Sequence, residues 1–346
     1  MTARGAAIQG TLALTALLAA YATWQRQPDK AAAGDVVVLD IGRNDLERVR
    51  YQDGPKSVDL ERRNEGSEKG LWLHLATRET PSDGGTGAPD AGVVAVAPEP
   101  KVPEREVRGN DQAEKVFDKF TPLRASRSLG VLDEAKRREL GLESSRKRLE
   151  VFARGGKHAS YVVSVSALGA GAPYLQSDQD NRVYLLGSSI ASDLDAASTR
   201  LVDRRLHAFK PSDYDSLTVK VDDKQREFVQ ISAETNQPQK LAAKKTPTKP
   251  DDFARNWHDK ILHLVVTEVL GKGEVPSAGE PKVAIRVDYS RRAKPVGWIE
   301  VSQPQKSPAG PAADMFARTE HTAGWVKVHA VGEDLLKEGK KIASEQ

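Results

Sequence analysis

The feature that most constrains this chain is an uncharged apolar run, AAIQGTLALTALLAAYATW, at residues 6–24. In a helix with a rise of about 1.5 Å per residue, this run extends roughly 28 Å, close to the thickness of the hydrocarbon core of a bilayer. Arg4 precedes the run, and Tyr21 and Trp24 lie where aromatic side chains usually meet the membrane–water interface. We therefore expect an N-terminal transmembrane helix within residues 1–30.

A cleaved signal peptide is the alternative interpretation of the same segment. Residues 12–21 have the length of a signal-peptide core, and Ala31, Ala32 and Ala33 offer small side chains for cleavage further along. The chain has no cysteine, which excludes a lipid anchor on cysteine, disulfides and cysteine-ligated metal sites. One short anchor ahead of a long polar domain usually leads to export of that domain, so we expect a single-pass protein.

The composition bounds the size and the partners of the polar remainder. A chain of 346 residues is long enough for two domains of ordinary size. Its 52 basic and 49 acidic residues leave a net charge of +3, so electrostatics give no reason to expect a nucleic-acid partner. Aromatic residues make up only 5% of the chain, which predicts a core built mostly from Val, Leu, Ile and Ala.

Short β-rich segments separated by turn residues dominate the polar part, with a few amphipathic helices between them. Residues 35–41 (DVVVLDI) and 215–221 (DSLTVKV) are rich in β-branched residues and predict strands. The strongest helical pattern starts at Asp251 and is closed by Gly271, with an apolar stripe formed by Phe253, Trp257, Ile261, Leu264 and Val265. This pattern predicts an α+β fold with antiparallel sheets.

The expected elements cover most of the two halves. The strands are expected at residues 35–41, 46–51, 57–62, 71–75, 148–153, 160–167, 172–177, 183–186, 215–221, 226–231, 283–289, 297–301, 316–318 and 325–329. The helices are expected at residues 111–120, 132–140, 190–201, 251–271 and 331–341. Residues 78–104 are rich in Pro, Gly, Ala and Asp, which predicts a disordered insertion between a strand and a helix.

An internal repeat is indicated by two similar stretches, residues 174–194 and residues 316–335. Both read as a strand, a polar turn, a second strand and then a helix. The strands that begin at Asp35 and Asp215 match as well. We therefore expect two tandem similar units, residues 34–210 and 211–346, each an antiparallel sheet with helices on one face. Chance similarity of two hairpin–helix segments is the alternative.

The sequence carries no motif that would assign a chemical activity. A phosphate-binding loop, a dinucleotide-binding GxGxxG and a GxSxG nucleophile motif are all missing. His258 and His263 are spaced so that they point to different faces of a helix, which argues against a zinc pair. Ser188 or Ser189 is expected to cap a helix, as is Asp251. We accordingly predict no catalytic, cofactor-binding or metal-binding residues and a protein that is not an enzyme.

The stretch from residue 160 to residue 219 resembles the bacterial family catalogued as domain of unknown function 4340. The resembling features are Tyr174-Leu175, the strand Val183-Tyr184-Leu185-Leu186, and the run RRLHAF at residues 204–209. The resemblance implies a membrane-anchored extracytoplasmic domain, with members often encoded beside gliding-motility-type ABC transporter components. No catalytic residues are established for the family, so none is transferred to this chain.

Together these features predict a protein of the bacterial inner membrane whose soluble domain lies in the periplasm. Its expected role is non-catalytic binding or scaffolding, as an accessory component of an ABC-transporter-like envelope assembly. One alternative is a module that binds cell-wall polysaccharide through exposed Trp72, Trp298 or Trp325, although we expect these rings to pack in the core. The other is a hydrolase of unrecognised type.

Overall fold

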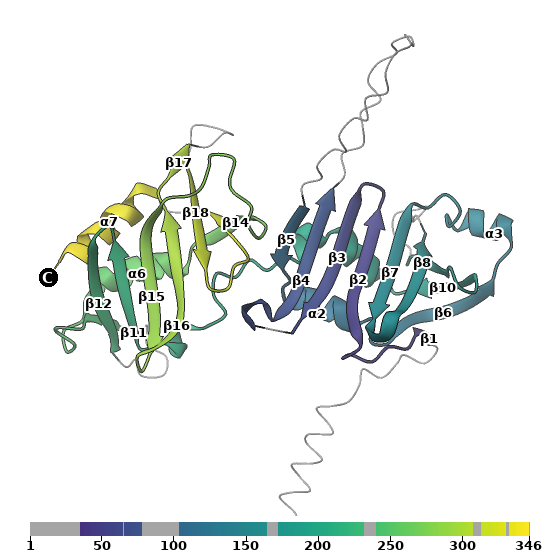
Figure 1. Cartoon of the computed structure of the whole chain (residues 1–346), viewed down its shortest axis with the longest axis horizontal. Helices are drawn as coiled ribbons and strands as arrows, with labels where there is room; N and C mark the ends of the chain where they lie inside the picture. Colours follow the sequence, from purple (N-terminus) through teal and green to yellow (C-terminus); the bar gives the residue numbers. More distant parts are fainter. Residues whose placement is uncertain are drawn as a thin grey trace, which may run out of the picture.

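Two mostly antiparallel sheets with a few helices make up the part of the chain that the computed structural model describes (Figure 1). The described residues are 35–64, 66–77, 104–164, 172–231, 240–306, 313–329 and 332–345. The α+β class and the antiparallel sheets agree with the prediction. The expected membrane helix at residues 6–24 lies outside the described residues, and among those described no helix is long and apolar enough to cross a membrane.

Among the described residues, the first sheet contains ten strands. They are β1 (Val36–Leu39), β2 (Leu46–Asp53), β3 (Lys56–Arg63), β4 (Gly70–Thr77), β5 (Glu104–Arg108), β6 (Leu123–Val131), β7 (Lys147–Ala153), β8 (Lys157–Val163), β9 (Tyr174–Ser177) and β10 (Arg182–Leu186). Their order across the sheet is β1-β6-β10-β9-β8-β7-β2-β3-β4-β5. The accompanying helices are α2 (Asp111–Asp118), α3 (Glu134–Glu139), α4 (Ser188–Asp195) and α5 (Ala197–Arg200).

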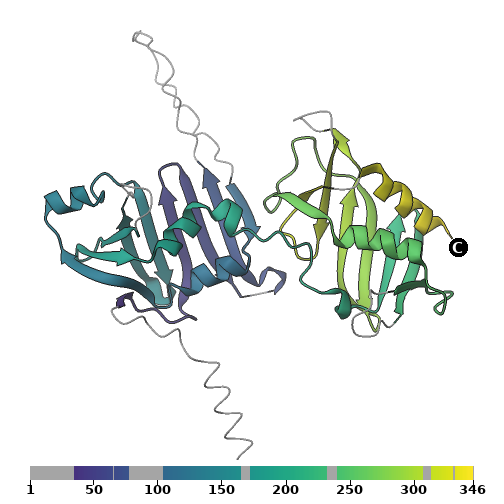
Figure 2. The same ribbon diagram turned by 180° about the vertical axis from the view of Figure 1, so that it is seen from behind.

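Helices α2 and α4 lie across one face of the first sheet, as Figure 2 shows. Helix α2 begins after Asn110, whose side chain accepts hydrogen bonds from the backbone N–H groups of Gln112 and Ala113. Its inner side chains, Val116 and Phe117, are buried in one core cluster with the inward residues of the strands. Each such burial stabilises the fold by roughly 1.5–3 kcal/mol, so packing rather than intrinsic propensity holds this short helix in place.

In the part of the chain that the structure describes, the second sheet contains nine strands. They are β11 (Ser216–Val221), β12 (Lys224–Ile231), β13 (Lys240–Ala243), β14 (Val265–Val269), β15 (Val283–Arg291), β16 (Lys294–Ser302), β17 (Gln305–Lys306), β18 (Ala313–Thr319) and β19 (Val326–His329). Their order is β13-β12-β11-β15-β16-β18-β19-β14, with the short β17 paired to β18. Helices α6 (Asp252–Leu262) and α7 (Gly332–Ser344) lie on one face. The Trp257 indole on α6 donates a hydrogen bond to the carbonyl of Leu335 on α7 at 2.9 Å.

The two sheets share one strand order. In the first sheet β4-β3-β2-β7-β8-β9-β10-β6 occupy the positions that β13-β12-β11-β15-β16-β18-β19-β14 occupy in the second. The helices fall at the same points of the chain, because α2 follows the first three of these strands as α6 does, and α4 follows the last hairpin as α7 does. The strand that matches β11 is therefore β2, and the predicted match between the strands beginning at Asp35 and Asp215 was wrong. Among the described residues, strand β1 instead forms the outer edge and pairs with β6.

The helix predicted from Asp251 to Gly271 was too long. Helix α6 ends at Leu262, and the chain re-enters the sheet as β14 beside β19. The run that starts at Val265 is β-branched and favours a strand over a helix. Val265 itself is 61% exposed, so it does not belong to the predicted apolar stripe.

Five strands, β5, β6, β13, β14 and β17, were missed by the prediction from sequence. The sequences EREVR in β5 and LRASRSLGV in β6 are rich in charged or small residues, whereas β14 was included in the helix predicted at residues 251–271. Strand propensity is strongly context-dependent, and these segments gain their hydrogen bonds from neighbouring strands. Because β5 starts at Glu104, the predicted insertion connects two strands rather than a strand and a helix. Residues 78–103 of that insertion lie outside the described residues.

The two sheets meet where the edge strand β5 faces the loop after β14. The backbone N–H of Lys272 donates to the carbonyl of Glu106 at 2.8 Å, and Arg105 pairs with Glu274 at 2.9 Å. Val269 packs against the core clusters of both sheets. This junction joins the sheets through backbone, ionic and apolar contacts at once.

A second set of contacts fastens the segment between the sheets. The backbone N–H of Asp203 donates to the carbonyl of Arg108 at 2.8 Å, and its carboxylate lies 3.0 Å from Nε2 of His321. Four residues later, Nδ1 of His207 lies 3.2 Å from a carboxylate oxygen of Glu320. The connecting segment is therefore tied at two points to the turn between β18 and β19.

Candidate functional site

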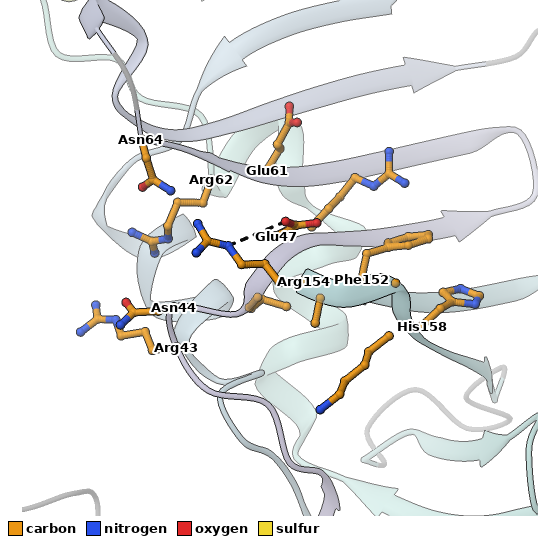
Figure 3. A pocket seen from close by; sticks show the side chains of 14 residues that line it. Arg43, Asn44, Glu47, Glu61, Arg62, Asn64, Phe152, Arg154 and His158 are labelled. Carbon is orange, nitrogen blue, oxygen red and sulfur yellow. Dashed lines mark ion pairs between the residues drawn. The ribbon is translucent and has the colours of Figure 1, made fainter.

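A polar groove of about 840 Å³ opens at one end of the first sheet, and we regard it as the candidate functional site (Figure 3). Its walls come from the turn before β2, the start of β2, the end of β3 and the β7–β8 hairpin. The lining residues are Arg43, Asn44, Leu46, Glu47, Arg48, Glu61, Arg62, Asn64, Phe152, Ala153, Arg154, Gly156, Lys157 and His158.

The centre of the groove is a row of side chains on directly paired strands. Arg48 on β2 is opposite Glu61 on β3 and opposite Phe152 on β7, and Phe152 is in turn opposite His158 on β8. Directly opposed residues of antiparallel strands point to the same face of a sheet, here the face away from Val49 and Leu60 and their helical cover. The row is therefore set by strand register alone.

Phe152 supports the basic groups at the centre of this row. The guanidinium carbon of Arg48 lies 4.2 Å from the centroid of the Phe152 ring. The His158 ring stacks on the same phenyl ring at 4.7 Å, with an angle of 24° between the two planes. A cation held over an aromatic face keeps its charge while its carbon atoms are packed, so Arg48 is oriented without being neutralised.

The groove carries five Arg or Lys side chains against two carboxylates. Arg43 pairs with Asp118 at 2.8 Å, and Arg62 pairs with Glu114 on the same helix at 2.6 Å. Among the described residues, however, Arg48 and Lys157 have no carboxylate within 4.0 Å.

The fifth basic residue, Arg154, forms only a weak ion pair, with Glu47. It lies 3.9 Å from Glu47, and both side chains are more than half exposed, at 59% and 58%. An exposed pair at that distance contributes little binding energy, so Arg154 stays available to a ligand. The groove as a whole presents a net positive charge to the solvent, which suits an anionic group.

The face of the sheet beyond the groove is charged but internally paired. Arg50 donates two hydrogen bonds to the carboxylate of Asp59, at 2.8 and 2.9 Å. The hydrogen bond to Asp59 raises the pKa of Arg50. Arg48 lies two residues before Arg50 on the same strand and has no such partner among the described residues. The uncompensated positive charge therefore lies at the end of the sheet, where Arg48 is.

The histidines discussed as metal ligands lie apart. His258 is buried in the second core, where burial lowers its pKa to about 3, and its Nε2 lies 3.2 Å from the hydroxyl of Tyr289. His263 lies at the end of α6 with Nδ1 2.7 Å from the carbonyl of Asp259. Within the described ranges no group of three or more His, Asp or Glu residues is arranged to hold a metal ion.

The predicted cap residues have mixed outcomes. Asp251 caps α6, since its side chain accepts a hydrogen bond from the backbone N–H of Ala254 at 2.9 Å. Ser188 and Ser189 do not cap α4, because the residue at that position is Gly187 and no side chain bonds there. The chain enters α4 directly from β10, which places both serines inside the helix.

The tryptophans proposed as sugar platforms are mostly covered. Trp72 is 2% exposed and Trp325 is 4% exposed. Arg63 and Arg318 lie over these two rings, at 4.7 and 4.5 Å from their centroids. Trp298 is half-buried beneath Arg286 at 4.8 Å. Two of the three rings thus have no free face for a sugar.

Comparison of the chain with protein-family models, with curated proteins and with solved structures found no match. The resemblance to the family of unknown function therefore stays a prediction.

The prediction from sequence missed the groove because its residues come from four separate segments. A usable signal was the aromatic Phe152 at an outward strand position, in one row with Arg48, Glu61 and His158. Recognising it required the register between β3, β2, β7 and β8, which no single segment reveals.

Proposed function

We propose that this chain is a membrane-anchored extracytoplasmic protein with a non-catalytic binding or scaffolding role in a bacterial envelope assembly. The observation that carries the proposal is the shared strand order of the two sheets, each with helices on one face (Figure 2). The other face carries charged side chains, such as Arg50 in the first sheet and Arg286 in the second. We also propose that the two sheets are tandem copies of one unit. A duplicated sheet offers two similar surfaces on one chain, an arrangement suited to holding partners.

The open face of the second sheet supports a role in polar protein–protein contact. Arg286 donates to Glu300 at 2.6 Å and to Asp288 at 2.8 Å, and Arg318 donates to Glu300 at 2.6 Å. This network of ion pairs holds Arg286 over the Trp298 ring and Arg318 over the Trp325 ring. Ordered Arg and aromatic groups are the residue types enriched at protein interfaces.

The histidine–carboxylate pairs support a structural rather than a chemical role. The pairs Asp203–His321 and His207–Glu320 both connect the segment between the sheets to the β18–β19 turn. Neither pair faces the basic groove of the first sheet. In our proposal these pairs stabilise the position of the segment between the sheets. The proposed role as a transporter accessory protein comes instead from the family resemblance.

Affinity purification of the full chain in mild detergent tests the proposal. We expect envelope proteins, including ABC transporter subunits, to be recovered in fixed proportion to the chain. A variant carrying Arg286→Glu and Arg318→Glu on the open face should no longer recover these proteins. A control variant carrying Lys56→Gln in the β2–β3 turn and Lys224→Gln in the β11–β12 turn should still recover them. Recovery of the chain alone at its native abundance would contradict the proposal.

A topology reporter fused after Lys30 tests the anchor independently. We expect a reporter that is active only outside the cytoplasm to give signal, and a reporter that is active only inside to give none. The opposite pattern would place the sheets in the cytoplasm and remove the membrane part of the proposal.

A further inference from the structure

We infer that two equivalent basic hairpins, one in each sheet, form a membrane-facing surface that binds the phosphate groups of anionic phospholipids. The inference rests on the proposed anchoring of the chain and names the ligand of the basic groove. The hairpins are the β7–β8 turn, Arg154-Gly155-Gly156-Lys157, and the β15–β16 turn, Arg291-Arg292-Ala293-Lys294.

The two hairpins occupy the same position in the shared strand order. Strands β7 and β8 lie between β2 and β9, just as β15 and β16 lie between β11 and β18. Both turns begin with arginine and end with lysine. The repeated fold therefore repeats a basic tip, although the surrounding sequence differs.

The backbone of the second hairpin is unusual for its residues. Gly155 and Gly156 have φ of 75° and 74°, values that glycine adopts without strain. At the matching tip, Arg292 and Ala293 have φ of 49° and 63°, a conformation in which tight hairpins usually place Asn or Gly. The second tip thus presents an additional arginine in place of a residue that would fit the turn more easily.

The positive charge of the second hairpin is not compensated by ion pairs. Arg291, Arg292 and Lys294 line a hollow of about 400 Å³, and none of them has a carboxylate within 4.0 Å among the described residues. The acidic residue Asp215 contacts this turn. Its Oδ2 accepts a hydrogen bond from the backbone N–H of Arg292 at 2.8 Å, and its charge also acts on Arg291, so Arg292 and Lys294 carry the uncompensated charge of the tip.

Both hairpins lie at the same end of the molecule. In Figure 1 the β7–β8 and β15–β16 turns are at the lower edge, whereas the β2–β3 and β11–β12 turns are at the upper edge. The junction of β5 with the loop after β14 holds the sheets in this arrangement, through the Lys272–Glu106 and Arg105–Glu274 contacts. The two basic tips can therefore meet one flat surface together.

The proposed membrane anchor precedes β1, and β1 lies at the same lower edge in Figure 1. Leu39 and Asp40, at the end of β1, line a hollow together with Lys157 and His158 of the first hairpin. Only ten residues separate the apolar run from Asp35, and ten residues span at most about 35 Å. The bilayer that holds residues 6–24 is thus within reach of the basic tips.

Lipid phosphate is the anion that fits this position. Arginine donates two parallel hydrogen bonds to a phosphate, and lysine adds a mobile point charge. Basic residues near an anionic membrane surface are attracted within a Debye length, about 8–10 Å at ordinary salt. A tether and two basic tips on one chain act together, because each contact raises the local concentration for the next.

Fluorescence quenching on the full chain tests the inference. The chain has no native cysteine, so a single Ala293→Cys can carry an environment-sensitive dye in nanodiscs that contain a headgroup-labelled quenching lipid. We expect quenching to be several-fold stronger in discs with one quarter phosphatidylglycerol than in phosphatidylcholine discs, and to fall with added salt, since each basic group contributes about a fivefold change. Asp223→Cys, in the β11–β12 turn at the opposite end, should remain unquenched in both.

Charge removal supplies the matched comparison. The set Arg154→Gln, Lys157→Gln, Arg292→Gln and Lys294→Gln should abolish the effect of phosphatidylglycerol on the dye, whereas Lys56→Gln with Lys224→Gln should leave it intact. Equal quenching in both types of disc, or quenching that survives the fourfold variant, would overturn the inference alone. Release of the chain from the discs by a carbonate wash would overturn the anchor and the inference with it.

Discussion

The guanidinium of Arg48 lies 4.2 Å above the ring of Phe152, and it has no carboxylate within 4.0 Å among the described residues. Arg50, two residues further along β2, is instead fixed by Asp59 at 2.8 Å. Two arginines on one face of one strand thus have opposite roles, since one is neutralised within the sheet and the other is held ready for an anion.

Removing the ring beneath Arg48 should release that side chain. A double-mutant cycle with Arg48→Ala and Phe152→Ala should give a coupling energy of about 0.5–1 kcal/mol, the usual range for a cation over an aromatic ring at a partly exposed site. The measurement is chemical unfolding of the full chain in mild detergent. The same cycle with Arg43→Ala in place of Arg48→Ala should give no coupling, and equal coupling in both cycles would refute the contact.

The buried His258 should make stability depend on pH. Burial lowers its pKa to about 3, below its ordinary value, so the folded state binds fewer protons than the unfolded state below neutral pH. The contribution of neutral His258 is complete above the unfolded pKa, about 6.5, and is lost as the pH falls toward 3. Between pH 7 and pH 5 we expect this group alone to cost roughly 2 kcal/mol.

The variant His258→Gln isolates this effect, because Gln can still bond the hydroxyl of Tyr289 without titrating. The loss of unfolding free energy between pH 7 and pH 5 should be smaller in the variant than in the natural chain. Identical pH dependence in the two proteins would show that His258 does not carry the effect.

Asp203 should stabilise the segment between the sheets through its two basic partners. Burial alone would raise its pKa, but hydrogen bonds from His321 and Arg205 hold the pKa of Asp203 well below its usual range. This contribution is present above the unfolded pKa, about 3.9, and is lost as the pH falls through the lower folded value. Replacement by Asn should cost about 1–3 kcal/mol at neutral pH.

Limited proteolysis near residues 203–210 gives a local readout for that change. Asp203→Asn should speed cleavage there, whereas Asp180→Asn, in the β9–β10 turn, should not. An unchanged cleavage rate in both variants would mean that the carboxylate does not fasten the segment.

The junction between the sheets should not tolerate a side chain at Gly271. A Cβ there would lie 3.1 Å from the Cα of Arg105 and 3.1 Å from the backbone nitrogen of Glu106. Those atoms belong to the backbone of β5, so an added methyl group would push the two sheets apart at the junction. Gly271→Ala should therefore make the two sheets unfold in separate transitions. Gly187→Ala, where a Cβ would meet open space, is the matched control, and calorimetry distinguishes the two. A single unchanged transition for Gly271→Ala would argue against tight packing at the junction.

The sequence was informative where local pattern decides the structure. The hairpin–helix pattern shared by residues 174–194 and 316–335 predicted elements that the structure contains, because alternating residues and turn signals specify hairpins locally. The match of Asp35 to Asp215 failed for a different reason. Strands β1 and β11 have similar β-branched composition, but position within a sheet depends on partners far away in the chain.

The candidate site could not be predicted from the sequence either, because it also depends on pairing between strands that are far apart in the chain. Arg48 and Phe152 meet because β2 pairs with β7 in one register, and a shift of one residue would turn Arg48 toward the core. The arginines that cover Trp72 and Trp325 could likewise not be identified from the sequence, because each comes from a neighbouring strand.

Strand β1 lies between the proposed tether and the repeated part of the first sheet, and in the described part of the chain it pairs on one side, with β6. Any pull transmitted along the tether would therefore load a four-residue edge strand before it reached the shared eight-strand pattern. Strand β1 should therefore detach from β6 before the rest of the sheet unfolds. Single-molecule stretching from the amino end should show a small initial extension at low force, followed by unfolding of the sheet at higher force.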